Sequence, residues 1–543
     1  MKYKNGIRQV LMPTIIAVTL ITGIFLGRNV LPDTSGSKRS GRLFIYPQSN
    51  KIETIINLIS DDYVDTIDRN DLTEKLIPDI LKHLDPHSIY IPAIDMKAAT
   101  EELEGFFGGI GVQFNIQNDT VLVIRVIPGG PSEKVGLKAG DRIVSVNDSI
   151  IVGTKIDSDQ VMSKLRGEFG TKVKVGIVRR SVNKILDFEI TRGNIPSLSV
   201  DVSYMLTNTT GYIKISKITQ NSYHEFLVAI AKLKNFGCRN LIVDLRDNSG
   251  GALDVSLQIC NEFMTKGDLL VYHEGRSSPR SNTYANGLGT CQDMGLTVLI
   301  DEFSASASEI IAGAIQDNDR GVIVGRRSFG KGLVQNPYPL PDGSSLRLTI
   351  ARYYTPSGRF IQKPYQSGIE DYHRDIWDRI EHGEMFEQDS ISFDQSLKHL
   401  TKNGRVVYGG GGIMPDIFVP RDTSDFTNFY FKIRNLIYTF SVKYADDNRD
   451  ILQKFTSAQE FDKYLETKKI TDQLIKYAEY EGIVIDQNEL KRSYRLINTQ
   501  LKAYIARNII DDDGFYPIIH QIDEVVKKAI SVIESGDAKN ILK

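Results

Sequence analysis

The stretch LTVLIDEFSASASEIIAGAIQD, residues 296–317, predicts a strand, a loop and a helix in direct succession. Its opening, LTVLID, is a short apolar run typical of a fully buried strand. A second stretch has the same plan, because LIVDL (241–245) runs into RDNSGG (246–251) and then into an expected helix at 252–263. Strand ends followed by glycine or serine loops at helix starts are where α/β sheets bind ligands.

The alternation of strands and helices extends on both sides and predicts an α/β core over residues 194–424. YIKIS (212–216) reads as a strand and residues 222–233 as a helix. SSLRLTIARYYTPSGRFIQ (344–362) predicts a strand and a turn that continue the same sheet. The polar, helix-prone segment 363–408 interrupts this pattern, and we expect it to be an insertion on the surface.

The segments on either side of this core have different sequence patterns. Residues 42–104 predict an N-terminal helical segment. Residues 105–193 consist of short β-branched runs separated by glycines, which predicts a small β-rich domain. Residues 425–543 have helical periodicity and no catalytic constellation, so this helical domain could cap the core or form the interface of a homo-oligomer.

The N-terminus contains nineteen uncharged residues between Arg8 and Arg28. A helix rises about 1.5 Å per residue, so this stretch is long enough to span a bilayer. We expect residues 1–28 to be a signal anchor held in the inner membrane through residues 10–27, with a polar linker at 29–41. The remaining chain would then face the extracytoplasmic, periplasmic side. A cleaved export signal is the alternative.

Composition excludes several classes of partner and site. The chain has 66 basic and 68 acidic residues and no block of like charge, so nothing predicts a nucleic-acid partner. Cys238, Cys260 and Cys291 are too scattered for a disulfide framework or a zinc site. His87, in LDPHS (84–88), has no second ligand at metal-binding spacing and is interpreted as a turn histidine. No metal site is expected.

The SASAS run contains three candidates for a nucleophile: Ser304, Ser306 and Ser308. Ser306 and Glu309 fit the capping box, in which a serine holds the start of a helix, and the local string alone favours that reading. The same geometry would place Ser306 beside unpaired N–H groups at the positive end of a helix, where a developing oxyanion is stabilised. A cap and a nucleophile are therefore compatible.

A serine nucleophile needs a base. No GxSxG elbow is present, and His224 and His273 stand isolated. Lys331 lies between two glycines in FGKG (329–332). A free lysine is roughly 0.1% neutral at neutral pH, so a base role requires burial that lowers its pKa by about 2–3 units. A surface lysine is the alternative, and the short string alone favours it.

The β-rich domain resembles a PDZ domain of the kind found in exported proteases. The resemblance rests on GGIGVQF (108–114), on PGGPSEKVGLKAGDRIVSVND (128–148), on an expected helix at 158–165 and on KVKVGIVRR (172–180). A glycine-rich turn before a strand directs backbone N–H groups to one point, which suits a terminal carboxylate, and the peptide would then add as a strand. The residues expected to bind the peptide C-terminus are Gly109, Ile110, Gly111 and Val112. A tight turn without a ligand is the alternative.

SASASE and FGKG resemble the catalytic segments of the carboxyl-terminal processing peptidases, also called tail-specific proteases, which are serine proteases with a Ser–Lys pair. The resemblance also includes LDPHS, the PDZ-like domain, DLRDNSGG and ARYYTPSGR, and so covers roughly residues 45–420. We expect an α/β multidomain chain with a crotonase-like protease core and an inserted PDZ-like domain. The segment 363–408 and the long helical C-terminus depart from the family pattern.

The resemblance implies a role for each site residue. It makes Ser306 the nucleophile, Lys331 its base and Gln335 the group that orients Lys331, with no metal or organic cofactor. The backbone N–H groups expected in the oxyanion hole are those of Gly250 or Gly251 and of Ala307. Asp317 lies about three turns along the helix from Ser306, some 16 Å away, so we assign it a supporting role in ordering the QDNDRG turn.

These observations predict an exported serine endopeptidase that binds the C-terminal tail of a protein substrate and cleaves it through an acyl-enzyme. One alternative is a catalytically weak PDZ scaffold that gathers partners at the membrane. Another is a crotonase-like acyl-thioester enzyme, because that fold also uses paired backbone N–H donors at helix starts.

Overall fold

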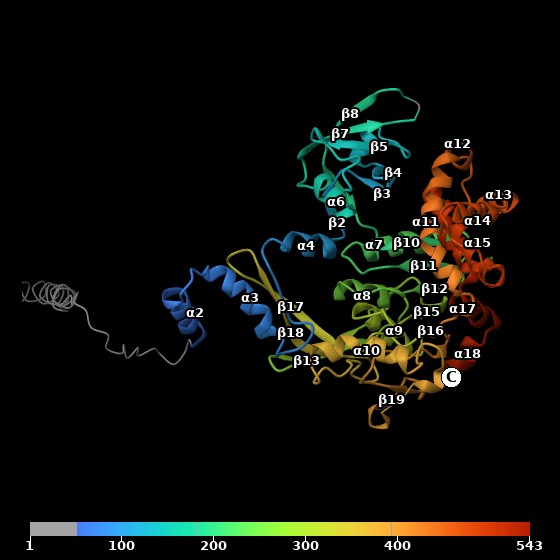
Figure 1. The fold of residues 1–543 in the computed structure, drawn as a ribbon. Coiled ribbons are helices and arrows are strands. Elements are labelled where there is room, and N and C mark those ends of the chain that lie inside the picture. Colours follow the sequence, from blue (N-terminus) through green and yellow to red (C-terminus); the bar gives the residue numbers. More distant parts are fainter. Residues whose placement is uncertain (1–50, 181, 392–393) are drawn as a thin grey trace, which may run out of the picture. The chain divides into compact units, whose positions relative to one another are not determined.

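The computed structural model describes residues 51–180, 182–391 and 394–543 (Figure 1). The chain divides into two units, Met1–Thr73 and Glu74–Lys543. The described part of the first unit contains α2 (Lys51–Asp62) and the start of α3 (Arg69–Leu81). No helix in the described ranges has the length and apolar character needed to cross a bilayer. The expected anchor, residues 10–27, lies outside those ranges.

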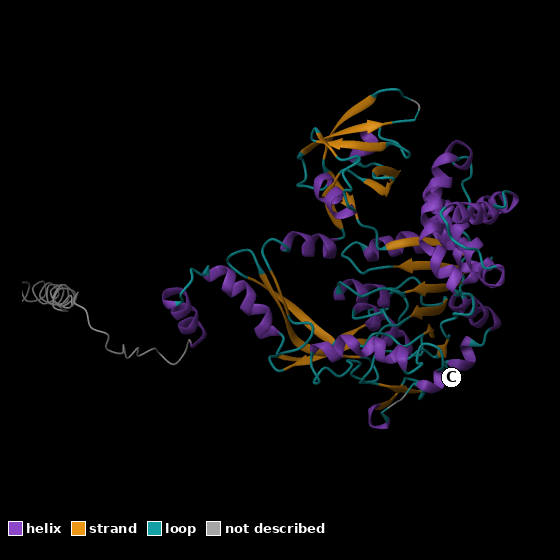
Figure 2. Ribbon diagram, in the orientation of Figure 1, coloured by secondary structure: helices purple, strands orange, loops and turns teal. Residues whose placement is uncertain are grey.

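The core of the second unit is a six-stranded sheet with the order β10-β11-β12-β15-β16-β21 (Figure 2). Its strands are β10 (Val200–Met205), β11 (Thr210–Ile215), β12 (Asn240–Asp244), β15 (Gly295–Ile300), β16 (Val322–Gly325) and β21 (Ile417–Phe418). All neighbours pair in parallel except the edge strand β10, which is antiparallel to β11. Such a sheet requires apolar cover on both faces, which explains the near-continuous apolar runs in the sequence.

Helices cover both faces of this sheet. The first face packs against α7 (Ser222–Asn235), α8 (Leu253–Asn261) and α9 (Ala307–Asp317). Side chains of the opposite face, such as Tyr212 and Leu299, pack against α17 (Glu524–Ser535) near the end of the chain. Part of the C-terminal region is therefore a layer of the core.

The strand expected at 344–362 belongs to a different sheet, so the prediction that it continues the central sheet was wrong. It forms β18 (Ser345–Tyr354) in a five-stranded antiparallel sheet. Its partners are β1 (Ile89–Ile91), β13 (Leu269–Gly275) and β17 (Leu333–Pro339), and β14 (Ser278–Tyr284) pairs with β13. The hairpin from β17 into β18 forms antiparallel pairs, whereas the parallel edge of the central sheet is completed by β21.

The β-rich domain is a second six-stranded sheet with the order β3-β4-β5-β7-β8 and β6 beside β5. Its strands and helices are β3 (Val112–Gln117), β4 (Thr120–Val126), α5 (Pro131–Lys134), β5 (Arg142–Val146), β6 (Ser149–Ile150), α6 (Ser158–Leu165), β7 (Lys172–Val178) and β8 (Ile185–Thr191). The chain enters the domain through β2 (Phe106–Gly109), after α4 (Met96–Glu104), and leaves it through β9 (Gly193–Pro196), which pairs with β2.

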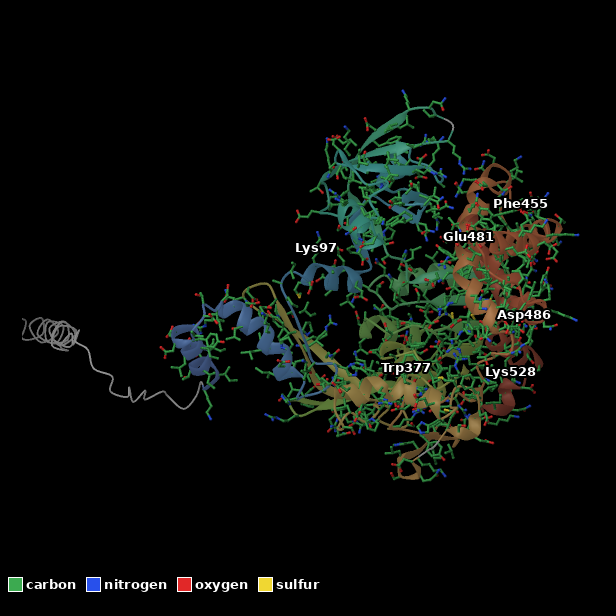
Figure 3. All side chains as sticks on the ribbon, viewed as in Figure 1. Lys97, Trp377, Phe455, Glu481, Asp486 and Lys528 are labelled. Atoms are coloured by element: carbon green, nitrogen blue, oxygen red, sulfur yellow. The ribbon has the colours of Figure 1, made fainter. Side chains whose placement is uncertain are left out.

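The segment 363–408 contains α10 (Ile369–Glu381), two short 3-10 turns (Gln388–Ser390 and Gln395–Leu397) and the hairpin β19 (Lys398–Leu400) with β20 (Val406–Tyr408). Trp377 is exposed on α10 (Figure 3). Tyr372 and Arg379 on the same helix are buried, however. The segment is thus not wholly at the surface, because α10 packs one side into the protein interior while the rest of the helix is exposed or partly exposed.

The C-terminal region is helical, as expected. Its elements are α11 (Asn428–Asp447), α12 (Arg449–Leu452), α13 (Ala458–Thr467), α14 (Ile470–Tyr480), α15 (Gln487–Ile510), α16 (Asp512–Ile519), the 3-10 turn His520–Ile522, α17 and α18 (Ala538–Ile541). Its first five helices and α16 share a separate apolar core, which includes Ile433 and Ile437 of α11 and Leu501 and Ile505 of α15. The mixed α/β organisation with a β-rich domain and C-terminal helices confirms the expected fold class at this level.

Candidate active site

Ser306 occupies the sharp corner between β15 and α9. Its φ of +54° is in the left-handed region, which a residue other than glycine rarely adopts. The corner is fixed on both sides, because the Ala305 N–H donates to the Asn248 carbonyl (2.9 Å) and the Ser306 N–H donates to Glu309 Oε2 (2.9 Å). Strain of this kind is concentrated at functional sites.

Of the three serines in SASAS, only Ser306 is partly exposed. Ser304 is fully buried, and its hydroxyl donates to the Leu245 carbonyl. Ser308 is also fully buried, and its hydroxyl donates to the Asn248 carbonyl (3.0 Å). Both hydroxyls are engaged in joining this corner to the loop after β12, so Ser306 is the serine available for chemistry.

Lys331 lies on the loop before β17 and is partly buried. Burial lowers the pKa of its ammonium group, and Arg347 lowers it further, while Glu309 and Asp85 act in the opposite direction. Lys331 Nζ donates to Gln335 Oε1 (3.3 Å). Of the three catalytic residues expected from the sequence, Ser306 and Lys331 thus lie on loops and Gln335 on β17, and the pKa of the Lys331 amine is lowered.

Glu309 joins the serine corner to the lysine loop. Its fully buried carboxylate accepts bonds from the N–H groups of Ser306 and Lys331 (2.9 and 2.8 Å), from the Gly330 N–H (2.7 Å) and from the Ser328 hydroxyl (2.5 Å). Burial raises the pKa of this carboxyl to about 7. The sequence interpretation gave Glu309 only the role of a cap, because the lysine loop that it binds is brought to it by the tertiary fold.

Two further groups at the site had no signal in the local sequence. The buried Tyr353 hydroxyl on β18 lies within hydrogen-bond distance of the carbonyls of both Ser306 and Lys331, which share its single proton. The backbone carbonyl of His87 accepts a bond from Gln335 Nε2. His87 was interpreted as a turn histidine, and it lies far from Gln335 in the sequence, so only the fold brings the two together.

The loop 246–251 faces the serine corner through its glycines. Gly250 has a φ of +100°, and a Cβ at this position would lie 2.8 Å from the Cβ of Ser306. The Gly250 N–H donates to Asn248 Oδ1 (2.9 Å), so it is already engaged. The Gly251 N–H is not used in the two bonds that this loop forms with Ile218. Of the two glycines expected in an oxyanion hole, Gly251 therefore has the more available donor.

Ala307 is the first residue of α9, so its N–H has no partner within the helix. An anion beside Ser306 would meet this N–H and the positive end of α9. The geometry is compatible with the oxyanion role that was predicted for this residue.

Asp317 lies at the far end of α9 and has no direct contact with the Lys331 loop in the hydrogen bonds of the described residues. Its carboxylate pairs with the buried Arg359 (2.6 Å) and accepts from the N–H and hydroxyl of Ser357 (3.0 and 2.6 Å). The expectation that Asp317 orders the QDNDRG turn was wrong, because its side chain holds the turn after β18.

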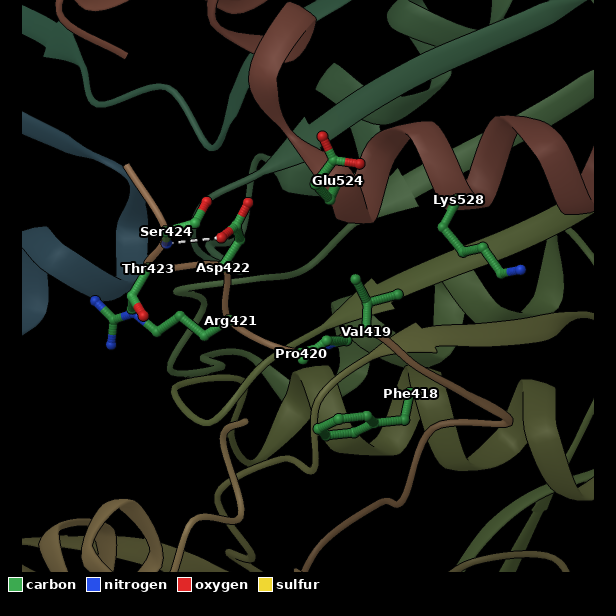
Figure 4. Close-up of a pocket in the computed structure, with 9 residues that line it drawn as sticks. All are labelled: Phe418, Val419, Pro420, Arg421, Asp422, Thr423, Ser424, Glu524 and Lys528. Carbon is green, nitrogen blue, oxygen red and sulfur yellow. Dashed lines mark hydrogen bonds between the residues drawn. The ribbon is translucent and has the colours of Figure 1, made fainter. Parts of the chain in front are cut away.

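A pocket of about 500 Å³ adjoins the serine corner. It is lined by Asp247, Ser249, Phe303, Ala305, Phe329 and Lys331. A larger hollow of about 720 Å³ lies between residues 418–424 and α17 (Figure 4). None of the predicted site residues lines that hollow, whereas the smaller pocket reaches Lys331 and the neighbour of Ser306.

The four residues expected to bind a peptide C-terminus lie where β2 leads into β3. Gly111 has a φ of +76°, and Ile110 is buried. The carbonyls of Ile110 and Gly111 accept from the N–H groups of Ser132 and Ile127 (both 3.0 Å), which fixes the turn. Since β3 is the edge strand of its sheet, a peptide could add beside it.

Comparison with known families now defines the class of this protein. Residues 209–372 match the model of Peptidase family S41, and residues 108–191 match the PDZ domain. Residues 430–511 match a family of unknown function, DUF8443. The chain is thus an S41 peptidase that contains a PDZ domain and a C-terminal helical region.

Individual relatives make the assignment more specific. The chain is 33% identical over 350 residues to the carboxy-terminal-processing protease of Bartonella bacilliformis, which covers 64% of this chain and 80% of that protein. It is 34% identical over 324 residues to the carboxy-terminal processing protease CtpB of Bacillus subtilis, covering 59% and 66% of the two chains. A solved photosystem II D1 C-terminal processing protease matches at 26% identity and a TM-score of 0.33, over 57% of this chain and 89% of that one. This chain belongs to the carboxy-terminal processing proteases, which are serine-type peptidases, so the predicted resemblance is confirmed.

Proposed function

We propose that this protein is an exported endopeptidase that binds the C-terminal tail of a protein substrate and cleaves peptide bonds with Ser306 and Lys331. One contact supports the assignment above the others: a single buried carboxylate, that of Glu309, binds the N–H groups of both residues. This contact brings the backbone of a partly exposed serine and the backbone of a lysine whose amine has a lowered pKa to the same carboxylate. The alternative of a catalytically weak PDZ scaffold is not favoured, because the chain belongs to a family of peptidases.

In this mechanism the Ser306 oxygen attacks the carbonyl carbon of the scissile bond, and the hydroxyl proton passes to the neutral amine of Lys331. The oxygen of the tetrahedral intermediate accepts bonds from the N–H groups of Ala307 and Gly251. Lys331 then gives its proton to the leaving amine as the peptide bond breaks. Water repeats the sequence on the acyl-enzyme and releases the second product.

Gln335 orients the amine in this scheme, because its side-chain oxygen accepts from Lys331 Nζ while its nitrogen is held by the His87 carbonyl. The pocket beside Ala305, with Phe303 and Phe329 in its wall, would receive a substrate side chain. The PDZ domain would bind the tail itself at Gly109, Ile110, Gly111 and Val112.

We further propose that residues 10–27 anchor the chain in the inner membrane and that the enzyme faces the extracytoplasmic side. The support is the uncharged stretch between Arg8 and Arg28. A second copy of the chain would bind through the helical region 425–543. Membrane fractionation with protease accessibility of the intact cell tests the first point, and light scattering of the purified chain tests the second.

The decisive experiment compares Ser306→Ala and Lys331→Ala with wild-type protein on a loosely folded substrate. We expect each variant to lower kcat/KM by roughly 10³-fold or more, with unchanged circular dichroism. Ser396→Ala and Lys402→Ala serve as matched controls, because both side chains are exposed and remain outside the site. Wild-type activity in either test variant would contradict the mechanism, and a wild-type protein that binds tails without cutting them would favour the scaffold.

A further inference from the structure

Helix α10 of the segment 363–408 holds the loop that carries Lys331. The buried Arg379 side chain donates to the carbonyls of Arg327 and Ser328 (2.8 and 3.1 Å). Glu384 pairs with Arg379 (2.9 Å) and with Arg327 (2.6 Å). A guanidinium can bind two carbonyls and a carboxylate at once because its donors form a rigid planar fork. The backbone immediately before FGKG is thereby fixed to the helix.

Tyr372, one of the largest fully buried side chains, holds the same loop from a second direction. Its ring packs edge-on against Phe329, with centroids 5.9 Å apart, and against His87 at 5.2 Å. The Lys363 ammonium lies 4.1 and 4.3 Å from the ring centroids of Phe329 and Tyr372 and pairs with Asp375 of α10. Aromatic and cation–π contacts of this geometry are stabilising in a buried setting.

Three hydrogen bonds connect the Tyr372 hydroxyl to the amine of Lys331 through the ring and backbone of His87 and the side chain of Gln335. The Tyr372 hydroxyl bonds to His87 Nε2 (2.7 Å), the His87 carbonyl accepts from Gln335, and Gln335 Oε1 accepts from Lys331 (3.3 Å). Burial lowers the pKa of His87 to about 4, so the imidazole is neutral at neutral pH and one ring nitrogen can accept. His87 itself is fixed by Asp85, whose carboxylate accepts from its N–H (2.8 Å).

We propose that Tyr372 and Arg379 are positioning residues for Lys331, with Arg379 fixing the backbone of its loop and Tyr372 fixing Gln335 through His87. The proposal rests on the Ser–Lys mechanism above and assigns a role to a segment that departs from the family pattern. Neither side chain touches the reacting atoms. Their effect on the reaction is transmitted through the placement and burial of the amine.

The test uses Tyr372→Phe, which keeps the ring and removes the hydroxyl, and Arg379→Lys, which keeps the charge and removes the fork. Tyr430→Phe is the matched control for a lost tyrosine hydroxyl bond, because Tyr430 binds Gln500 in the helical region. Arg374→Lys is the control on α10, where Arg374 is exposed. Rates are normalised to the concentration of active sites, measured by titrating Ser306 with a fluorophosphonate. This normalisation removes the effect of misfolded protein.

We expect each test variant to lower kcat by about threefold to tenfold and to leave KM within about twofold, since one or two hydrogen bonds near the base are lost. We also expect the acid limb of the pH profile to move to higher pH. Burial is the main cause of the lowered pKa of Lys331, and a loosened loop admits water. The charged or titratable groups that act on Lys331 or share its pocket are Arg347, Glu309, Asp85, His87 and Asp247, and all of them are unchanged in the variants.

Hydrogen exchange of residues 327–335 gives an independent measure of the loop. Faster exchange there in both test variants, and not in the controls, supports the proposal. Unchanged kcat, pH profile and exchange in Tyr372→Phe and Arg379→Lys, beside an inactive Lys331→Ala, would overturn the positioning role alone. Full activity of Lys331→Ala would instead contradict the underlying mechanism.

Discussion

At the scale of single residues, the site depends on backbone positions that have little tolerance for a side chain. Gly250 lies directly behind Ser306, and a Cβ there would also lie 2.7 Å from the Ala305 carbonyl oxygen and 2.8 Å from the Ala307 nitrogen. All three atoms belong to the corner that sets the nucleophile and its helix. A contact under 3 Å with backbone requires the corner itself to move.

Gly250→Ala should therefore lower the rate of Ser306 acylation by a fluorophosphonate by roughly 10²-fold, because it displaces the nucleophile and the Ala307 donor. Gly237→Ala is the matched control, since Gly237 also has a positive φ, of +85°, but a Cβ added there would meet no neighbouring atom within 4 Å. Gly237→Ala thus measures the effect of alanine at a positive φ alone, without a steric clash between the added Cβ and neighbouring atoms. Equal acylation rates in the two variants would show that the contact with Ser306 is unimportant.

At the scale of elements, the strands and helices of the core could be predicted from apolar runs, but the sheet that each strand joins could not. The apolar positions of residues 344–362 indicate a strand but not its neighbours, and only long-range pairing places β18 in the antiparallel sheet. The polar sequence of α10 gave no sign that Tyr372 and Arg379 would be buried, because their partners lie on the loop 327–329 and at His87. Ser306 and Lys331 were singled out by the resemblance of SASASE and FGKG to the family's segments, because the local strings alone favoured a helix cap and a surface lysine. Glu309 and His87 act through contacts that the fold creates.

The 3-10 turn before α17 places His520 in a polar cluster on the face of the central sheet that packs against α17. The imidazole bonds through Nδ1 to the Tyr204 hydroxyl of β10 and contacts the Tyr212 ring at 4.7 Å between centroids. Burial lowers the pKa of His520 to about 4; Arg246 and Lys214 lower it further, while Asp523 and Asp244 act in the opposite direction. The folded state therefore requires a neutral imidazole at this position.

His520 should consequently make stability fall as the pH is lowered. Its folded pKa is below the unfolded value, so its contribution is fully present above pH 6.5 and is lost as the pH falls toward 4. The loss amounts to about 2–3 kcal/mol, since one pKa unit corresponds to about 1.4 kcal/mol. Urea unfolding of His520→Gln at several pH values should show a shallower decline in this window, whereas the exposed His382→Gln should follow the wild type. Parallel curves for wild type and His520→Gln would contradict the assignment.

At the scale of the second unit as a whole, ion pairs join the PDZ domain to the helical region. The Asp446 carboxylate at the end of α11 is almost fully buried and accepts from Arg142 (2.5 Å) and Arg180 (2.8 Å) of the PDZ domain. A second pair links Arg125 of β4 to Asp511. A carboxylate that is buried between two arginines is costly to leave unpaired, so this contact depends on its charge complementarity.

Asp446→Asn should therefore destabilise the folded protein and loosen the PDZ domain at this contact. We expect a loss of roughly 1–3 kcal/mol, less than for a fully buried pair because Arg180 is half exposed. Asp447→Asn removes a neighbouring carboxylate that also pairs with Arg180 but is 44% exposed, and it should cost about 0–1 kcal/mol. Urea unfolding gives the two free energies, and hydrogen exchange of β5 and of the end of α11 locates the change. If the two substitutions cost the same, or if exchange increases elsewhere, the buried pair does not secure the PDZ domain.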